Sequence, residues 1–99
     1  NIIMNAMDAM PGGGRLTITT RMSEDGRSVE IEFKDTGSGI PEEYLKKIFD
    51  PFFTTKGTKG TGLGLAISYG IIQQHNGRIQ VKSMVGQGTI IVVSLPVVR

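Results

Sequence analysis

The stretch Lys56-Gly57-Thr58-Lys59-Gly60-Thr61-Gly62-Leu63-Gly64-Leu65 places glycines at alternate positions after two lysines. Glycine has no Cβ, so it reaches positive φ angles and lets a ligand approach the backbone closely. The stretch runs into an apolar segment with helical spacing, and a glycine loop at a helix N-terminus directs several unpaired N–H groups at one place. These features predict a polyphosphate-binding loop in which Lys56 and Lys59 contact phosphate.

This loop alone is a weak signal. It is neither a P-loop nor a dinucleotide fingerprint, because no strand runs directly into it and no acid follows about 20 residues on. The alternative for Lys56 and Lys59 is that they are solvated loop side chains. The rest of the chain has to decide between these interpretations.

The composition describes one small globular domain. The chain has 99 residues, of which 38% are hydrophobic, and its net charge is +2. Basic and acidic residues are interspersed, so no basic face indicates nucleic acid as a partner. The absence of cysteine excludes disulfides and cysteine-ligated metal. No apolar run approaches the roughly 20 residues that cross a bilayer, so we expect no membrane segment in this chain.

Hydrophobic periodicity predicts three helices and four strands. The segment from residue 62 has the pattern of a buried helix, and Asn76-Gly77 is its stop signal. The first two strands form an expected antiparallel hairpin with one solvated face. This order of elements predicts an α+β fold, a two-layer sandwich with a mixed, mostly antiparallel sheet covered on one face by about three helices. We expect helices over residues 1–10, 41–48 and 62–74, and strands over 15–22, 28–34, 78–84 and 89–96.

Three further polar features allow two interpretations each. Asn1 and Asn5, one helical turn apart, are either surface or capping residues or amide ligands for a hard cation such as Mg²⁺. Asp35, which precedes a glycine turn, is either a strand end or a carboxylate that accepts a hydrogen bond from an exocyclic amine such as that of adenine. His75 follows a predicted helix, where a cation favours the helix dipole, so we expect a structural role for it.

Four motifs, taken in order, resemble the N, G1, F and G2 boxes of sensor histidine kinases. The resemblance covers residues 1–99 and extends to Gly86-Gln87-Gly88-Thr89 before the last strand. It implies the Bergerat ATP-binding fold shared with type II topoisomerases, mismatch-repair ATPases and a major cytosolic chaperone. The four motifs are Asn1-x-x-x-Asn5-Ala6, Asp35-x-Gly37-x-Gly39, Phe49-x-Pro51-Phe52 and Gly60-Thr61-Gly62-Leu63-Gly64-Leu65.

The resemblance also implies roles for individual residues. Asn5 looks like the Mg²⁺-coordinating asparagine, with Asn1 as its partner on the same face. Asp35 looks like the carboxylate that recognises adenine, with Gly37 and Gly39 shaping the base pocket. Residues 52–61 would form a short lid, similar to that of nitrogen-regulatory kinases, anchored by Phe49, Phe52 and Phe53. The remaining nucleotide contacts are Ile40, Lys56, Lys59, Gly60, Thr61, Gly62, Leu63, Gly64, Leu65 and Thr89.

The residue at position 1 separates two kinds of relative. ATP-hydrolysing members carry a glutamate where Asn1 stands, and an amide cannot serve as the general base. The resemblance therefore implies transfer of the γ-phosphate of ATP-Mg²⁺, with Asn5 and Lys56 as catalytic residues, to a histidine on a separate dimerisation domain. A response regulator would act downstream, in a homodimeric kinase whose catalytic part is cytoplasmic. The alternative is an ATPase or a nucleotide-regulated switch, such as an anti-sigma-factor kinase or a chaperone-like ATPase.

Two features depart from the family pattern. Many members carry a basic residue where this chain has Asp8. The chain also starts at the N box, so we expect the preceding helix and strand to be missing and one flank of the core to be uncovered. His75 does not match the acceptor motif, and this partial domain is therefore expected not to phosphorylate itself.

Overall fold

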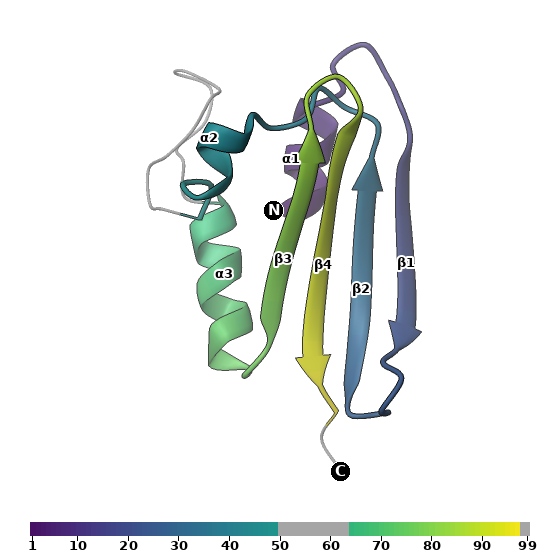
Figure 1. Ribbon diagram of the computed structural model, residues 1–99, viewed down its shortest axis with the longest axis vertical. Helices are drawn as coiled ribbons and strands as arrows, with labels where there is room; N and C mark the ends of the chain where they lie inside the picture. Colours follow the sequence, from purple (N-terminus) through teal and green to yellow (C-terminus); the bar gives the residue numbers. More distant parts are fainter. Residues whose placement is uncertain (50–63, 98–99) are drawn as a thin grey trace.

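The computed structural model describes residues 1–49 and 64–97 of the chain (Figure 1). The described elements confirm the expected order of helices and strands. They are α1 (Ile2–Asp8), β1 (Leu16–Met22), β2 (Ser28–Asp35), α2 (Glu42–Leu45), α3 (Gly64–Gln74), β3 (Arg78–Met84) and β4 (Gly88–Pro96).

The four strands form one sheet in the order β1-β2-β4-β3, and every neighbouring pair in it is antiparallel. The last strand, β4, inserts between β2 and β3 and becomes central. Its register places Thr89 opposite Asp35 of β2 and opposite Ser83 of β3. Three polar side chains therefore lie in a row at one end of the sheet, on the same face.

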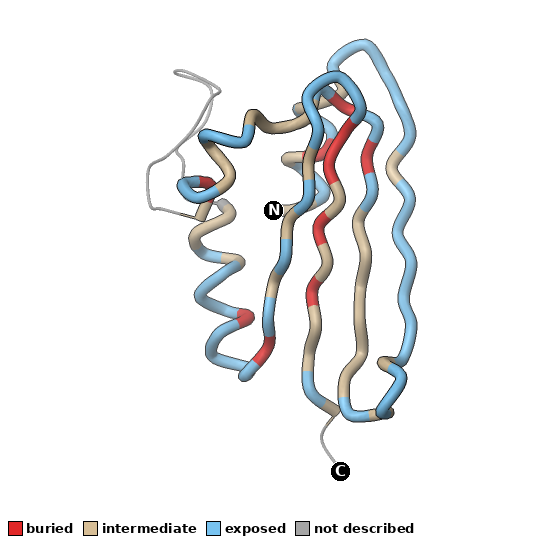
Figure 2. Tube along the Cα trace, in the orientation of Figure 1, coloured by how far each residue is buried: buried red, intermediate tan, exposed pale blue. Residues whose placement is uncertain are grey.

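That face is the one covered by helices (Figure 1). Side chains alternate across a strand, and the buried side chains of β4 belong to every second residue, Thr89, Ile91 and Val93. Figure 2 shows these buried positions along β4. Burying one Ile or Val side chain contributes about 1.5–3 kcal/mol. The buried apolar residues of the described structure are Ala6, Ile48, Ile72, Ile91 and Val93.

The opposite face of the β1–β2 hairpin is polar and solvated, as the alternation predicts. Arg21 Nε of β1 lies 2.9 Å from Glu30 Oε1 of β2, and Arg21 Nη2 lies 3.8 Å from Glu32 Oε1. Exposed ion pairs of this kind contribute at most about 1 kcal/mol. The pairs therefore contribute little to the stability of the hairpin, and they show which of its faces is solvated.

The helix predicted over residues 41–48 is shorter than expected. Only Glu42–Leu45 is α-helical, and Pro41, with ψ at 143°, precedes the helix instead of opening it. The Tyr44 N–H donates to the Pro41 carbonyl at 2.9 Å, and the Lys47 N–H donates to the Tyr44 carbonyl at 2.8 Å. Both bonds span three residues, so the chain tightens into turns and does not extend the helix.

The sequence predicts a buried helix over residues 62–74, and the prediction of burial is wrong. Residues 62 and 63 lie outside the described residues, and α3 from Gly64 exposes Ile67 and Ile71, at 51% and 52%. Among the helix positions whose burial is described, only Ile72 is buried, at 8% exposure. The described structure packs one stripe of α3 on β3 and leaves the opposite stripe in solvent.

The inner face of the sheet is poorly covered at the β1 edge. Ile18 and Met22 are 49% and 56% exposed, and Met4 and Met7 of α1 are also exposed. Figure 2 shows exposed positions along most of β1. None of the described helices has the length and apolarity needed to cross a bilayer.

Candidate functional site

The loop that follows β2, residues 35–40, is the centre of the candidate site. Asp35 is only 8% exposed. Its Oδ1 accepts hydrogen bonds from the Gly37 N–H at 2.9 Å and from the Thr89 N–H at 3.2 Å. Its other oxygen, Oδ2, accepts none from the described residues. The two backbone bonds therefore hold the carboxylate in one orientation.

A backbone hydrogen bond joins helix α1 directly to this loop. The Ser38 N–H donates to the carbonyl of Ala9, at the C-terminal end of α1, at 3.1 Å. A Cβ on Gly37 would lie 2.7 Å from the Ala9 carbonyl oxygen and 2.8 Å from its Cβ. Glycine is required here because helix and loop touch along the backbone. This contact sets the position of α1, which carries the two asparagines, relative to Asp35.

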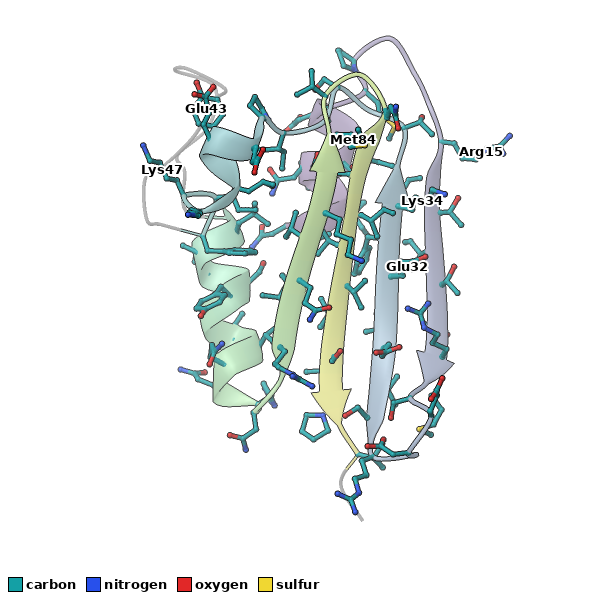
Figure 3. All side chains as sticks on the ribbon, viewed as in Figure 1. Arg15, Glu32, Lys34, Glu43, Lys47 and Met84 are labelled. Atoms are coloured by element: carbon teal, nitrogen blue, oxygen red, sulfur yellow. The ribbon has the colours of Figure 1, made fainter. Side chains whose placement is uncertain are left out.

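The turn between β3 and β4 holds the loop from another side. The Gly86 N–H donates to the Ser38 carbonyl at 2.9 Å. Gly39 has φ at +77°, and a Cβ there would collide with the Met84 carbonyl oxygen. Figure 3 labels Met84 at this end of β3. The glycines of the loop thus allow its backbone to lie close to α1 and to this turn.

The two asparagines lie one turn apart at the start of α1, as their spacing predicts. Asn1 occupies the N-cap position but makes no side-chain capping hydrogen bond. Its carbonyl accepts from the Asn5 N–H at 3.0 Å, which closes the first helical turn. The capping interpretation of Asn1 is therefore not supported. Asn5 is half-buried and Asn1 is exposed.

The structure describes part of the remaining predicted site. Gly64 and Leu65 open α3, and Ile40 is half-buried at the end of the Asp35 loop. Thr89, at 5% exposure, lies beside Asp35 on the inner face. The predicted residues that lie outside the described ones are Pro51, Phe52, Phe53, Lys56, Lys59, Gly60, Thr61, Gly62 and Leu63.

Two residues singled out from the sequence have packing or backbone roles. The Phe49 ring stacks on Tyr69 of α3, with centroids 5.2 Å apart and an interplanar angle of 28°. His75 is exposed just beyond α3, and its backbone N–H donates to the carbonyls of Ile71 and Ile72. The ring contact fits the packing alternative for Phe49, at a partly exposed place. His75 follows α3 as predicted, and the structural role expected of its side chain stays a prediction.

Comparison with known proteins identifies the class. The family described as "Histidine kinase-, DNA gyrase B-, and HSP90-like ATPase" matches residues 1–99. The chain is 46% identical over 97 residues to sporulation kinase E of Bacillus subtilis (strain 168), covering 98% of this chain and 13% of that protein. It is 44% identical over 97 residues to the sensor histidine kinase ZraS of Escherichia coli (strain K12), covering 98% of this chain and 20% of ZraS.

Solved structures agree with this class. The mycobacterial sensor histidine kinase MprB superposes with a TM-score of 0.84 at 29% identity, over 96% of this chain and 66% of that one. The nucleotide-free catalytic domain of histidine kinase ThkA gives 0.80 at 36% identity, over 96% of this chain and 61% of that one. The chain therefore belongs to the histidine kinase-, DNA gyrase B- and HSP90-like ATPase family, as an ATP-binding domain of the sensor histidine kinase type.

This result confirms the resemblance stated from the four motifs, and the fold class with it. One polar residue of the described site was missed: Ser83, which lies beside Thr89. The available signal was a serine on the inward stripe of β3, after Ile79 and Val81. A hydroxyl at a position that alternation assigns to the apolar face needs a hydrogen-bond partner.

Proposed function

We propose that this chain binds ATP-Mg²⁺ and holds the γ-phosphate for transfer to a histidine on a separate helical domain. The observation that supports this most is the Asp35 carboxylate. It is buried, fixed through Oδ1 by two backbone N–H groups, and carried on a loop that is bonded to α1. No ion pair to this carboxylate occurs among the described residues, and the two backbone donors offset the cost of burying it.

Asp35 is the proposed adenine reader. Its Oδ2 is the acceptor left over after the backbone bonds are made, and the exocyclic amine of adenine is a matching donor. Gly37, Gly39 and Ile40 belong to the same loop and would shape the base pocket. Thr89 adds a buried hydroxyl next to the carboxylate. A site of this kind discriminates by leaving a buried polar group unpaired when the wrong base enters.

Asn5 is the proposed Mg²⁺ ligand, with Asn1 beside it. Mg²⁺ keeps several waters and takes few protein ligands alongside phosphate, and an amide oxygen suits it. No cluster of three or more His, Cys, Asp or Glu occurs among the described residues. The amide donors of α1 fit a cation bound mainly through nucleotide phosphate. The bound ion would supply neutralisation of the charge that develops on the transferred phosphoryl group.

The phosphate side of the site is assigned from the sequence motif. Lys56 and Lys59 are proposed as flexible cationic contacts. Backbone N–H groups of the glycine-rich stretch are proposed to face the phosphates. The residues concerned are Gly60, Thr61, Gly62, Leu63, Gly64 and Leu65.

Transfer is favoured over hydrolysis because of Asn1. An amide at this position cannot take a proton from water, so catalysis would rest on positioning and charge neutralisation. The chain spans 13% and 20% of the two curated relatives named above. We propose that the acceptor histidine lies on a dimerisation domain of a homodimeric kinase, that a response regulator receives the phosphoryl group, and that the reaction takes place in the cytoplasm.

The test is a transfer reaction in trans. The 99-residue chain is mixed with the separately expressed histidine-bearing helical domain of its parent kinase and γ-labelled ATP. We expect acid-labile, base-stable label on the helical domain, and less of it with Asp35→Asn at ATP concentrations near the wild-type Kd. ATP that binds without phosphohistidine formation would overturn the transfer function. Steady phosphate release by the chain alone, abolished by Asn1→Ala, would favour the ATPase alternative.

Magnesium dependence has its own test. ATP affinity of the wild type should rise when Mg²⁺ is added, and Asn5→Ala should remove most of that increase because the amide ligand is gone. Met7→Ala, an exposed change on the same helix, should leave the increase intact. Identical magnesium titrations for wild type and Asn5→Ala would contradict the assignment.

A further inference from the structure

We infer that Ser83 is a positioning residue that orients the Asp35 loop and the Thr89 hydroxyl, and so contributes to base specificity. Ser83 lies near the end of β3, directly across from Thr89 of β4. Its Oγ accepts a hydrogen bond from the Ile40 N–H at 2.7 Å. It also lies 2.8 Å from Thr89 Oγ1 and 3.0 Å from the Gly88 carbonyl oxygen.

The hydrogen-bond capacity of a hydroxyl determines how these contacts can coexist. A serine hydroxyl has one proton to donate and two lone pairs. The Gly88 carbonyl can only accept, so the Ser83 proton satisfies it. One lone pair is used by the Ile40 N–H, and the other can accept the Thr89 proton. Ser83 is then saturated, which leaves it no capacity to contact a ligand directly.

The same arrangement sets the polarity of the Thr89 hydroxyl. When Thr89 donates its only proton to Ser83, Thr89 Oγ1 can only accept from a further group. The neighbouring Asp35 Oδ2 is also an acceptor. The buried end of the site therefore presents acceptors, which match an amine and disfavour a carbonyl at the same place on the base.

Ser83 also joins the two ends of the Asp35 loop. Asp35 is the first residue of the loop, and its Oδ1 accepts a hydrogen bond from the Thr89 N–H at 3.2 Å. The last residue is bonded through the Ile40 N–H to Ser83. The Ser83 and Thr89 hydroxyls contact each other across β3 and β4, so the two ends of the loop are linked through the Thr89 backbone and this hydroxyl pair. Removal of the Ser83 hydroxyl would leave the part-buried Ile40 N–H without its acceptor.

This inference rests on the proposed function, and the experiment separates the two. Binding of ADP and of inosine diphosphate, in which a carbonyl replaces the amine, is measured by calorimetry for the wild type and for Ser83→Ala. Loss of a part-buried hydrogen bond predicts a roughly tenfold weaker ADP affinity. We also expect a smaller preference for ADP over inosine diphosphate, because the Thr89 hydroxyl can then donate to the carbonyl.

A matched control and a conservative variant complete the design. Ser94→Ala removes a half-buried serine of β4 whose hydroxyl bonds to none of the described residues, and it should change neither affinity nor preference. Ser83→Thr restores a hydroxyl and should restore the preference. In the nucleotide-free chain, hydrogen exchange of the Ile40 amide should accelerate in Ser83→Ala and not in Ser94→Ala.

The outcomes are distinguishable. A wild-type chain that binds neither nucleotide contradicts the proposed function itself. A wild type that prefers ADP together with a Ser83→Ala variant of the same preference overturns the role of Ser83. An equal loss for both nucleotides, with reduced thermal stability, shows a purely structural role and overturns it too. Where Ser83→Ala does not fold, a Ser83→Thr variant without preference for ADP overturns the inference.

Discussion

At the scale of single residues, the site depends on how buried polar atoms share their hydrogen bonds. Asp35 divides its two oxygens, Oδ1 for the protein backbone and Oδ2 for the proposed ligand. Because Asp35 is buried, leaving either oxygen without a hydrogen bond would cost free energy, as an unpaired polar atom is poorly stabilised in a low-dielectric environment. The residue is thus structural through one oxygen and functional, in the proposed role, through the other.

Asp35→Asn tests this division. The amide oxygen can keep the two backbone bonds while the amide nitrogen replaces Oδ2, so a donor faces the adenine amine. We expect adenine-nucleotide binding to weaken by about 1–3 kcal/mol, roughly 5- to 150-fold, as measured by calorimetry. Asp25→Asn, the same chemical change in the β1–β2 turn, should have no effect on binding. Normal ADP affinity in Asp35→Asn would show that Asp35 does not read the base.

At the scale of elements, the end of α3 shows how local chemistry places the next strand. Asn76 adopts φ at +60°, and the Gly77 N–H donates to the Ile72 carbonyl at 2.9 Å. This is the left-handed ending that asparagine and glycine favour. A Cβ on Gly77 would meet the Ser94 carbonyl oxygen and the side chain of Leu95. The helix stop therefore also brings the chain against β4.

Asn76→Ala should destabilise the protein by about 1 kcal/mol, because alanine enters the left-handed region at a cost of roughly 1–2 kcal/mol. Asn76→Gly should be neutral or slightly stabilising, because glycine adopts positive φ without a Cβ clash. Urea unfolding at constant m-value measures both changes. The exposed helical substitution Gln74→Ala serves as control and should stay within about 0.5 kcal/mol. Equal stabilities of Asn76→Ala and Asn76→Gly would contradict this account.

The β1–β2 turn is a second element with its own chemistry. Asp25 Oδ1 accepts from the Ser23 hydroxyl at 2.7 Å and from the Arg27 N–H at 3.0 Å. These bonds, the serine bond first, lower the pKa of Asp25 below its usual value. A depressed folded-state pKa stabilises the protein at pH values above the unfolded pKa of about 3.9. This contribution is lost as the pH falls through the folded-state pKa.

Ser23→Ala should therefore raise the pKa of Asp25 back toward its ordinary value. Carbon-detected NMR titration of the Asp25 carboxyl measures the change directly. The difference in stability between wild type and variant should also shrink as the pH falls below about 3.9, since Asp25 becomes protonated in both. Ser94→Ala is the control and should leave the Asp25 titration unchanged. An unshifted titration in Ser23→Ala would rule out the serine as the main cause.

At the scale of the whole molecule, the site lies where separate parts of the fold meet. Helix α1, the Asp35 loop and the β3–β4 turn are joined by the Ser38 N–H to Ala9 and the Gly86 N–H to Ser38 bonds. A nucleotide bound among them would stabilise the folded state and not the unfolded chain. Its effect would therefore appear in global stability as well as in local contacts.

ADP at 100 times its Kd should stabilise the protein by about 2.7 kcal/mol. For a domain of this size, each 1 kcal/mol raises Tm by roughly 4–8 °C, so a shift on the order of 10–20 °C is expected by calorimetric melting. At the same ADP concentration, Asp35→Asn should lose between about one third and nine tenths of the shift, because its affinity is expected to be roughly 5- to 150-fold lower. A shift of equal size in both proteins would place the binding energy elsewhere.

Much of the fold could be read from local patterns. The strands β1, β3 and β4, the hairpin, and the stop at Asn76-Gly77 follow from alternation and turn chemistry, which depend only on neighbouring residues. The length of α2 and the exposure of Ile67 and Ile71 could not be read in this way. An apolar helical stripe indicates what can be buried, and only the position of the other elements decides what is buried.

The sequence by itself determined the class of this protein, because the order and spacing of its four motifs can be read without a structure. It also marked Asp35 and Thr89 as candidates, but as separate points in the chain. Only the tertiary structure decided that β4 inserts between β2 and β3, which brings Asp35, Thr89 and Ser83 into one row. The physical reason is that strand order and register arise from long-range pairing, while motifs and turns are local.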